Sequence, residues 1–402
     1  MLQKTEKKES ILKYKLLYTI IILMIYITGK SLPLYGIDLS AYLYKTVDAQ
    51  GILFQTISGD IYRCSIFALG ISPYMISSMI MQVINAIQGS ESRAKKSPLK
   101  MNRQILGLTL FFAIVQATLE VRQLQFNVNP DELLMTRMIA TMEMVAGVMI
   151  IIWLSSRNKR YGIGGQTALI FVNILDGIRT TLTSAEQDML YVPIAISLLV
   201  MFVMLIMENA EMRIPLQRIS IHNIYADKNY LAIKLNPIGV MPAMFGTAFF
   251  MVPQIIIRIL KMIFPQNETI LWWNNNMVLT KPLGVVIYIC VLYALTIGFS
   301  RVFINPKELT EQFLKSGDCL ENIRAGKDTK RYLSKTITRV SILSATVMSI
   351  CLGLPMILQM YGKMDNLLTT LPSSIMMLTG IWCNLYREVV AIKELDEYKP
   401  FI

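Results

Sequence analysis

The sequence holds a single histidine and few charged residues. Of its 402 residues, 16% are Asp, Glu, Lys or Arg, against roughly 25% in a typical soluble domain. The five cysteines, Cys64, Cys290, Cys319, Cys351 and Cys383, stand singly, without a Cys-x-x-Cys pair. Metal sites and disulfide frameworks both need clusters of such residues. The sequence therefore predicts neither, and we expect no bound cofactor.

Motifs of the common enzyme classes are also missing. There is no Walker-type phosphate loop, no His-Glu-x-x-His and no Gly-x-Ser-x-Gly. The glycine-rich run YGIGGQ is interpreted as a turn that leads into the next apolar segment. We therefore predict that the chain is not an enzyme.

Apolar sequence is what the chain has in abundance: 54% of its residues are hydrophobic, and the mean hydropathy is +0.48. About 20 apolar residues span a bilayer. The sequence predicts an all-α polytopic membrane protein with ten transmembrane helices, near residues 14–31, 65–87, 104–124, 137–155, 166–178, 189–207, 238–257, 283–304, 337–358 and 368–389.

The distribution of Lys and Arg predicts the orientation of these spans. With the N-terminus in the cytosol and alternating crossings, most of the 39 basic residues fall on the cytosolic side, as short cytosolic loops require. The fifth run is short and holds Asn173 and Asp176, but omitting it would place the loops SSRNKR and EMRIPLQR on opposite sides. We expect ten crossings and two cytosolic termini.

The second apolar run contains a break at Gly70 and Pro73, directly after the half-polar segment GILFQTISGDIYR at residues 51–63. Proline within a helix removes a backbone hydrogen bond, which a membrane tolerates where other helices or a water-filled cavity satisfy the freed groups. The pattern favours a pathway through the membrane. A kinked packing helix is the alternative.

Two predicted cytosolic loops, residues 208–236 and 305–335, are longer and more basic than topology needs. Loops of this length are usually functional or disordered, and cap signals such as NPKELTEQ favour order. We interpret the loops as docking surfaces for a cytosolic partner. The net charge of +12 indicates contact with anionic lipid, and no motif indicates nucleic acid.

Four stretches of the chain resemble the SecY family of protein-translocase channels. SIFALGISPYMISSMIMQ is similar to that family's second span, EMRIPLQR to a basic cytosolic loop, and LNPIGVMPAMF to the start of its seventh span. INPKELTEQFLKSGDCLENIRAGKDTKRYLSKTITR is similar to its large cytosolic loop. The resemblance implies a protein-conducting channel built from two pseudosymmetric inverted halves, residues 1–183 and 184–402, with residues 51–63 as a plug.

The resemblance also implies roles for particular residues. Gln82 would face a lateral gate between spans 2 and 3 on one side and 7 and 8 on the other, although a packing hydrogen bond is the ordinary role of such a Gln. Docking of a SecA-type motor ATPase would use Arg213, Arg218 and Arg324. A narrow apolar ring would line the pore, formed by Ile71, Met75, Ile170, Ile174, Met244 and Met377.

Departures from the family pattern favour the accessory SecY of Gram-positive bacteria. Ala325 follows Arg324 where the family usually has Pro, and the chain holds 27 Met. That resemblance implies small SecE- and SecG-like partner subunits, a plasma-membrane location, and unfolded secretory substrates such as serine-rich glycosylated adhesins. A housekeeping SecY is the alternative.

A solute transporter would need paired acids in the membrane, for which Glu143 and Asp176 are the candidates without an obvious partner. A structural membrane scaffold without a pathway is the third class of function, after the channel and the transporter.

Overall fold

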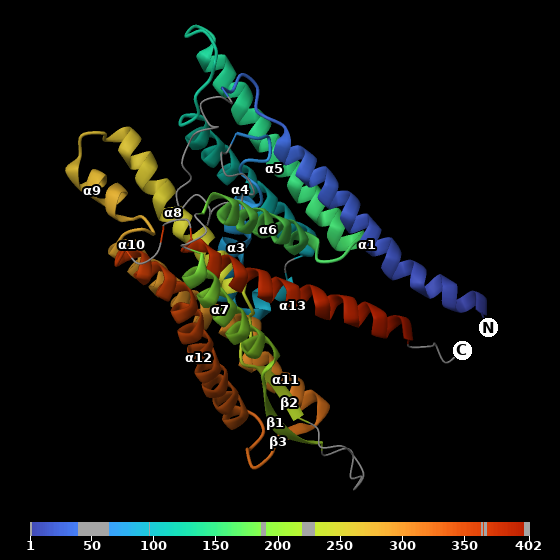
Figure 1. Ribbon diagram of the computed structural model, residues 1–402. Coiled ribbons are helices and arrows are strands. Elements are labelled where there is room, and N and C mark those ends of the chain that lie inside the picture. Colours follow the sequence, from blue (N-terminus) through green and yellow to red (C-terminus); the bar gives the residue numbers. More distant parts are fainter. Residues whose placement is uncertain are drawn as a thin grey trace.

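Helices make up most of the protein in the computed structural model (Figure 1). The structure describes residues 2–38, 64–95, 97–185, 190–218, 230–362, 365 and 368–397. Within these ranges, every predicted span overlaps a long helix. These helices are α1 (Leu2–Ser31), α3 (Ser72–Lys95), α4 (Pro98–Val121), α5 (Leu133–Tyr161), α6 (Gly165–Ser184), α7 (Tyr191–Asn209), α8 (Met241–Ile263), α10 (Pro282–Phe303), α12 (Lys327–Met360) and α13 (Thr370–Glu397).

In the described part of the chain, 8 helices are long and apolar enough to cross a membrane. Of the long helices, α3 and α6 fall outside this set. The last turns of α3 carry the polar sequence SESRAK, and α6 holds Asn173 and Asp176 among its apolar residues. The protein is therefore a mostly helical, multi-pass membrane protein, in which hydropathy marks α3 and α6 less clearly than the rest.

The predicted break in the second run is the beginning of a helix. Residues 66–71 form turns, Gly70 has a φ of 53°, and α3 starts at Ser72. A positive φ is strained for most side chains, which explains the glycine. Pro73 stands in the first turn, where its missing N–H costs no helical hydrogen bond. The interpretation of Pro73 as an interruption within a helix is wrong. The predicted plug, residues 51–63, lies outside the described residues.

A small antiparallel sheet makes the purely helical prediction wrong in one respect. Its strands are β1 (Glu211–Arg218), β2 (Tyr230–Lys234) and β3 (Asp318–Leu320), in the order β2-β1-β3. The first two strands belong to the predicted loop 208–236, and β3 belongs to the loop 305–335. Alternation of apolar residues in EMRIPLQR is typical of a strand with one buried face, and it is too short to stand out against the surrounding spans.

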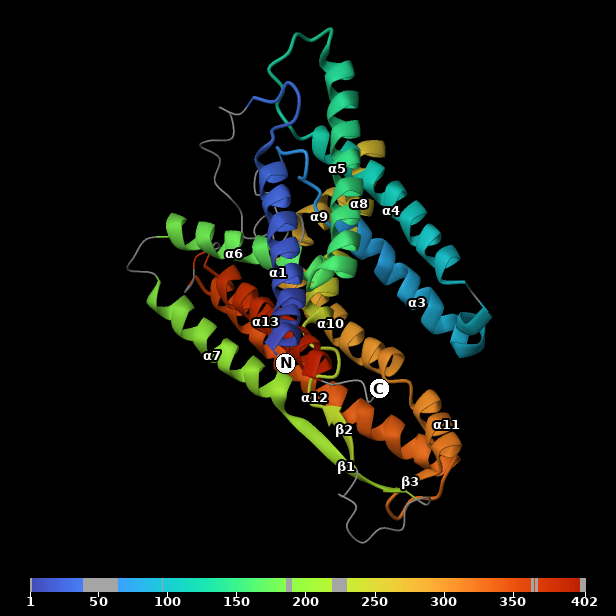
Figure 2. The ribbon, with the colours of Figure 1, turned by 90° about the vertical axis from the view of Figure 1, so that its right-hand side faces the viewer.

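The sheet has a hydrophobic core of its own. Ile214 of β1, Ile233 of β2 and Leu320 of β3 are buried against Leu333 and Ile337 of α12. Helix α11 (Pro306–Ser316) adds Leu309 and Phe313 to this cluster. We call the sheet, α11 and the first turns of α12 the sheet module. It lies at the lower end of the molecule in Figures 1 and 2, whereas α9 (Glu268–Asn276) lies higher in both views.

Candidate functional site

The six residues predicted to form the pore ring are all buried. They come from the turn before α3 and from four helices, α3, α6, α8 and α13. None exposes more than 5% of its surface, and all belong to the largest apolar cluster of the described chain: Ile71, Met75, Ile170, Ile174, Met244 and Met377. The structure therefore brings together side chains that stand up to about 300 positions apart in the sequence.

Burial alone does not separate a ring from ordinary packing, because the same cluster holds many other buried residues. The six come from both halves of the chain, five of them on helices and Ile71 in the turn before α3. Residues 170 and 174 are spaced so that they lie on one face of α6, and the N–H of Met75 donates to the carbonyl of Ile71 at 3.0 Å. The pore ring stays a prediction. Its six members are buried inside the helix bundle, as a pore ring requires.

Two polar contacts position α6. The hydroxyl of Tyr26 on α1 donates to Oδ1 of Asn173 at 2.8 Å, one residue before Ile174. Lys30 Nζ forms an ion pair with Asp176 Oδ2, also at 2.8 Å. The interpretation of Asp176 as an acid without a partner is therefore wrong. The same interpretation is wrong for Glu143, because its Oε2 accepts from the backbone N–H of Tyr35 at 3.0 Å. Both acids have structural partners.

The glycine-rich turn before α6 is held from two sides. Gly164 and Gly165 have φ values of 76° and 49°, which confirms a turn at this point. The buried Asn158 donates through Nδ2 to the carbonyls of Ile163 and Gly165, each at 2.9 Å. Glu388 of α13 accepts from the N–H of Gly164 at 3.0 Å. The end of α5, the turn and α13 are thereby fixed to one another.

Gln82, the predicted gate residue, lies on α3 in a partly buried position. Its Oε1 atom is buried and accepts no hydrogen bond among the described residues. Helix α3 packs against α4 and α8, so Gln82 belongs to a helix at the seam where the resemblance places the gate. A buried amide oxygen without a donor costs free energy, and the position of Gln82 at the gate stays a prediction.

The predicted docking arginines gather on the sheet module. Arg213 lies on β1, with its guanidinium 4.7 Å from the ring centre of Tyr230 on β2. Arg218 ends β1, opposite Asp318 in the pairing with β3. Arg324 is exposed in the turn between β3 and α12, where its carbonyl accepts from Thr329 Oγ1 at 2.8 Å. Two loops separated by 68 residues thus place these three positions on one unit.

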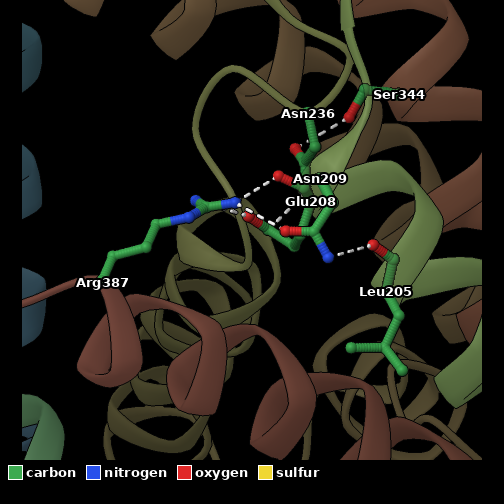
Figure 3. Close-up of polar contacts among 6 residues, drawn as sticks. All are labelled: Leu205, Glu208, Asn209, Asn236, Ser344 and Arg387. Atoms are coloured by element: carbon green, nitrogen blue, oxygen red, sulfur yellow. Dashed lines mark hydrogen bonds and ion pairs between the residues drawn. The ribbon is translucent and has the colours of Figure 1, made fainter. Parts of the chain in front are cut away.

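A buried polar cluster joins this module to the helices (Figure 3). Glu208 at the end of α7 exposes 1% of its side chain and pairs with Arg387 of α13, with Nη1 and Oε2 3.5 Å apart. Asn236 Nδ2 donates to Glu208 Oε1 at 3.0 Å. Ser344 of α12 donates to Asn236 Oδ1, also at 3.0 Å. The cluster ties three helices together beside the segment that follows β2.

A third ion pair, between α4 and α8, was likewise not predicted from the sequence. Arg258 Nη1 of α8 and Glu120 Oε1 of α4 are 3.2 Å apart. Charges within apolar runs seldom stand without partners. The arginine in FFMVPQIIIRILKM and the glutamate that ends IVQATLE were therefore visible signals. The pairing of Arg258 with Glu120 could not be predicted, because nothing in the sequence indicates which acidic residue contacts which basic residue.

The chain matches a known protein family along most of its length. The family model described as SecY matches residues 65–386. The chain belongs to the SecY family. The matched range covers the turn before α3, the sheet module, the long helices α3 to α12 and the first part of α13. It confirms the resemblance drawn from the four motifs.

Curated relatives match over nearly the full chain. The accessory Sec system protein translocase subunit SecY2 of Leuconostoc gelidum subsp. gasicomitatum is 28% identical, covering 96% of this chain and 95% of the relative. That of Streptococcus agalactiae serotype III is 29% identical, covering 97% and 96%. The relatives carry the accessory name that the departures from the general SecY pattern favoured.

Solved structures share the fold at low sequence identity. One described as "The structure of a protein conducting channel" has a TM-score of 0.68 at 18% identity and covers 97% of this chain and 94% of its own. Sec61 in a canine ribosome-channel complex has a TM-score of 0.63 at 17% identity, with the same coverage. The helical arrangement is therefore that of the SecY and Sec61 channels.

Proposed function

We propose that this SecY-family chain is the protein-conducting channel subunit of an accessory Sec translocase, which passes unfolded secretory polypeptides across the plasma membrane. The observation that carries the proposal is the match to relatives named accessory Sec system protein translocase subunits, over at least 95% of both chains. In this channel Ile71, Ile174, Met244 and Met377, which lie in one apolar cluster, would belong to the pore ring. A ring of apolar side chains closes a pore to ions by dewetting. Unbranched methionine side chains adapt to an irregular polypeptide.

The proposed architecture follows the inverted-repeat logic of membrane transporters. All ten long helices cross the membrane, in halves 1–183 and 184–402 of opposite topology, with both termini in the cytosol. Residues 51–63 form the plug. Gln82 on α3 and the contact of α3 with α8 support a lateral gate between α3 and α4 on one side and α8 and α10 on the other.

The proposed partners dock at separate places. A SecA-type ATPase, which performs the ATP hydrolysis, binds the sheet module through Arg213, Arg218 and Arg324. Guanidinium groups pair with carboxylates in a bidentate geometry that lysine does not reproduce. Small SecE- and SecG-like subunits, or their accessory equivalents, bind along the helices. Basic cytosolic segments contact anionic lipid.

Two alternatives remain distinct from this proposal. A housekeeping SecY channel would serve general secretion, and the relatives named as accessory subunits favour the accessory role. In that role the substrates are serine-rich glycosylated cell-wall adhesins. A solute transporter is disfavoured because Asp176 pairs with Lys30 and Glu143 accepts from a backbone N–H, which leaves neither acid poised for an ion or solute.

Reconstitution tests the proposal. The chain with its small subunits is placed in liposomes and supplied with a SecA-type ATPase, ATP and either an unfolded adhesin precursor or a general secretory precursor. ATP-dependent protection of the adhesin from external protease is the expected result. Protection of the general precursor alone indicates a housekeeping channel, and protection of neither overturns the channel assignment.

A further inference from the structure

A groove on the outside of the helix bundle runs between α4 and α5. Its volume is about 1040 Å³, at the upper end of the range of about 300–1000 Å³ for small-molecule pockets. Most of its lining is apolar. Leu134, Met138 and Met142 of α5 line it and expose 70%, 52% and 72% of their surfaces. These side chains face the surroundings of the bundle and not its core.

Two arginines stand at one end of this groove. Arg122 follows the last residue of α4, and Arg137 lies in the second turn of α5, about 6 Å from its start at 1.5 Å per residue. Consecutive antiparallel helices place both residues near the same membrane face. In the proposed orientation, this is the outer face.

Neither guanidinium has a carboxylate partner in the described chain. Nε of Arg137 is buried and makes no hydrogen bond with any described residue. Among the described residues, Nη1 of Arg122 donates to the thioether of Met262, at 3.3 Å, and a thioether is a weak acceptor. Asp131 and Glu132 precede α5 but do not line the groove. The groove therefore holds positive charge without a carboxylate partner among the described residues. The proposed topology places this charge near the outer headgroup layer, because Arg122 directly follows the apolar span of α4.

The length of the groove corresponds to a single leaflet. On α5 the lining runs from Leu133 to Ala146, about 20 Å at 1.5 Å per residue. On α4 it runs from Ile114 to Arg122, about 12 Å on the same scale. The hydrocarbon core of a bilayer is about 30 Å thick. A partner helix would need a surface along that whole thickness, whereas one acyl chain needs about half.

From these observations, we propose that the α4–α5 groove binds an anionic phospholipid, with its phosphate on Arg122 and Arg137 and an acyl chain along Met138 and Met142. Arginine forks suit phosphate oxygens, because two parallel N–H···O bonds form at once. The hydroxyls of Thr118 and Thr141 donate to carbonyls of their own helices. The guanidiniums are therefore the donors available to a headgroup. The site is separate from the pore.

Native mass spectrometry of the full-length protein in detergent tests this site, using phosphatidylglycerol and phosphatidylcholine with identical acyl chains. We expect preferential retention of phosphatidylglycerol. The double variant Arg122→Gln, Arg137→Gln should bind it about tenfold more weakly, since charge-assisted hydrogen bonds are lost. Ala146→Trp, at an exposed lining position, should also weaken binding by filling the groove. Arg179→Gln, at an exposed position of α6 outside the groove, is the matched control.

A photo-crosslinking amino acid in place of Met142 identifies the occupant in native membranes. Lipid adducts are expected. A discrete protein adduct overturns the proposal in favour of a partner subunit, and so does equal retention of the two lipids or unchanged binding by the arginine variant. Lipid retention is measured without translocation, so its failure is distinguishable from failure of the proposed channel function.

Discussion

Arg258 of α8 and Glu120 of α4 form an ion pair with 3.2 Å between Nη1 and Oε1. The two side chains expose 31% and 14% of their surfaces. The pair connects helices that are distant in sequence, and both helices border the proposed lateral gate. On the same face, Ser72 Oγ contacts Met251 Sδ at 3.3 Å and Arg122 contacts Met262. Of these three contacts, the ion pair is the one between opposite charges.

Loss of this pair should favour an open channel. Glu120→Gln removes one charge and leaves Arg258 poorly paired in an apolar surrounding, at a cost of about 1.5–3 kcal/mol for a charged hydrogen bond. We expect a several-fold higher ion conductance of the resting channel in planar bilayers, at normal levels of inserted protein.

The charge-exchanged double variant Glu120→Arg, Arg258→Glu is the control for this effect. It should return the conductance toward that of the unmodified channel, because the attraction is restored with its sign arrangement reversed. A double variant as leaky as Glu120→Gln would assign the effect to packing instead.

Arg324 provides a test of the docking surface. Arg324→Glu reverses the charge of an exposed residue without touching the core of the sheet module. We expect normal insertion and folding but at least a tenfold loss of ATP-driven export, because the variant repels the carboxylates that a guanidinium would bind. Export into proteoliposomes measures this.

Lys315→Glu is the matched control for Arg324→Glu. Lys315 is exposed on α11 of the same module and undergoes the same charge reversal. Export should be nearly unchanged in this variant. Equal losses in the two variants would indicate a general effect of charge, and normal export by Arg324→Glu would remove Arg324 from the docking surface.

Polar substitutions in the ring should open the resting pore to ions. Ile174→Asn places an amide among apolar side chains at a fully buried position. It should lower the stability by about 1–3 kcal/mol and raise the resting conductance several-fold, because a polar lining holds water.

Met204→Asn separates these two consequences. Met204 of α7 is equally buried in the same cluster but is not assigned to the ring. The Met204→Asn variant should lose a comparable amount of stability, but its resting ion conductance should not rise. Similar conductance from both variants would show that any disturbance of the core causes leakage, and the ring assignment would lose its support.

Removal of the Glu208–Arg387 ion pair should destabilise the protein. Arg387→Ala leaves the carboxylate of Glu208 buried without its cation, which costs about 3 kcal/mol in comparable cases. We expect a clear decrease in the thermal unfolding midpoint of the purified protein in detergent. The double variant with Glu208→Gln should recover part of the loss, since the amide removes the buried charge and can still bond to Asn236.

Arg339→Ala on α12 controls for the loss of an arginine. Arg339 is exposed, and we expect its replacement to change the midpoint little, as is usual for surface substitutions. An Arg387→Ala midpoint equal to that of the Arg339→Ala variant would contradict the structural role of the cluster shown in Figure 3.

Local physical chemistry determined much of this protein from the sequence alone. Long apolar runs form helices because only internally hydrogen-bonded segments are stable in lipid, and each predicted run overlaps a long helix. Asn305 caps α11 by accepting from the N–H of Lys307, and Gly317 ends the helix with a φ of 72°. Such signals lie within a few residues of their effects.

Tertiary structure decided what depends on residues far apart. The sequence did not indicate that β3 would join β1, because pairing between distant segments leaves no local pattern. It presented Asp176 as an acid without a partner, and the packing of α1 against α6 supplied Lys30. Apolar spacing likewise placed Ile170 and Ile174 on one face of a helix, but only the packing of that helix with the others turned the face into the interior.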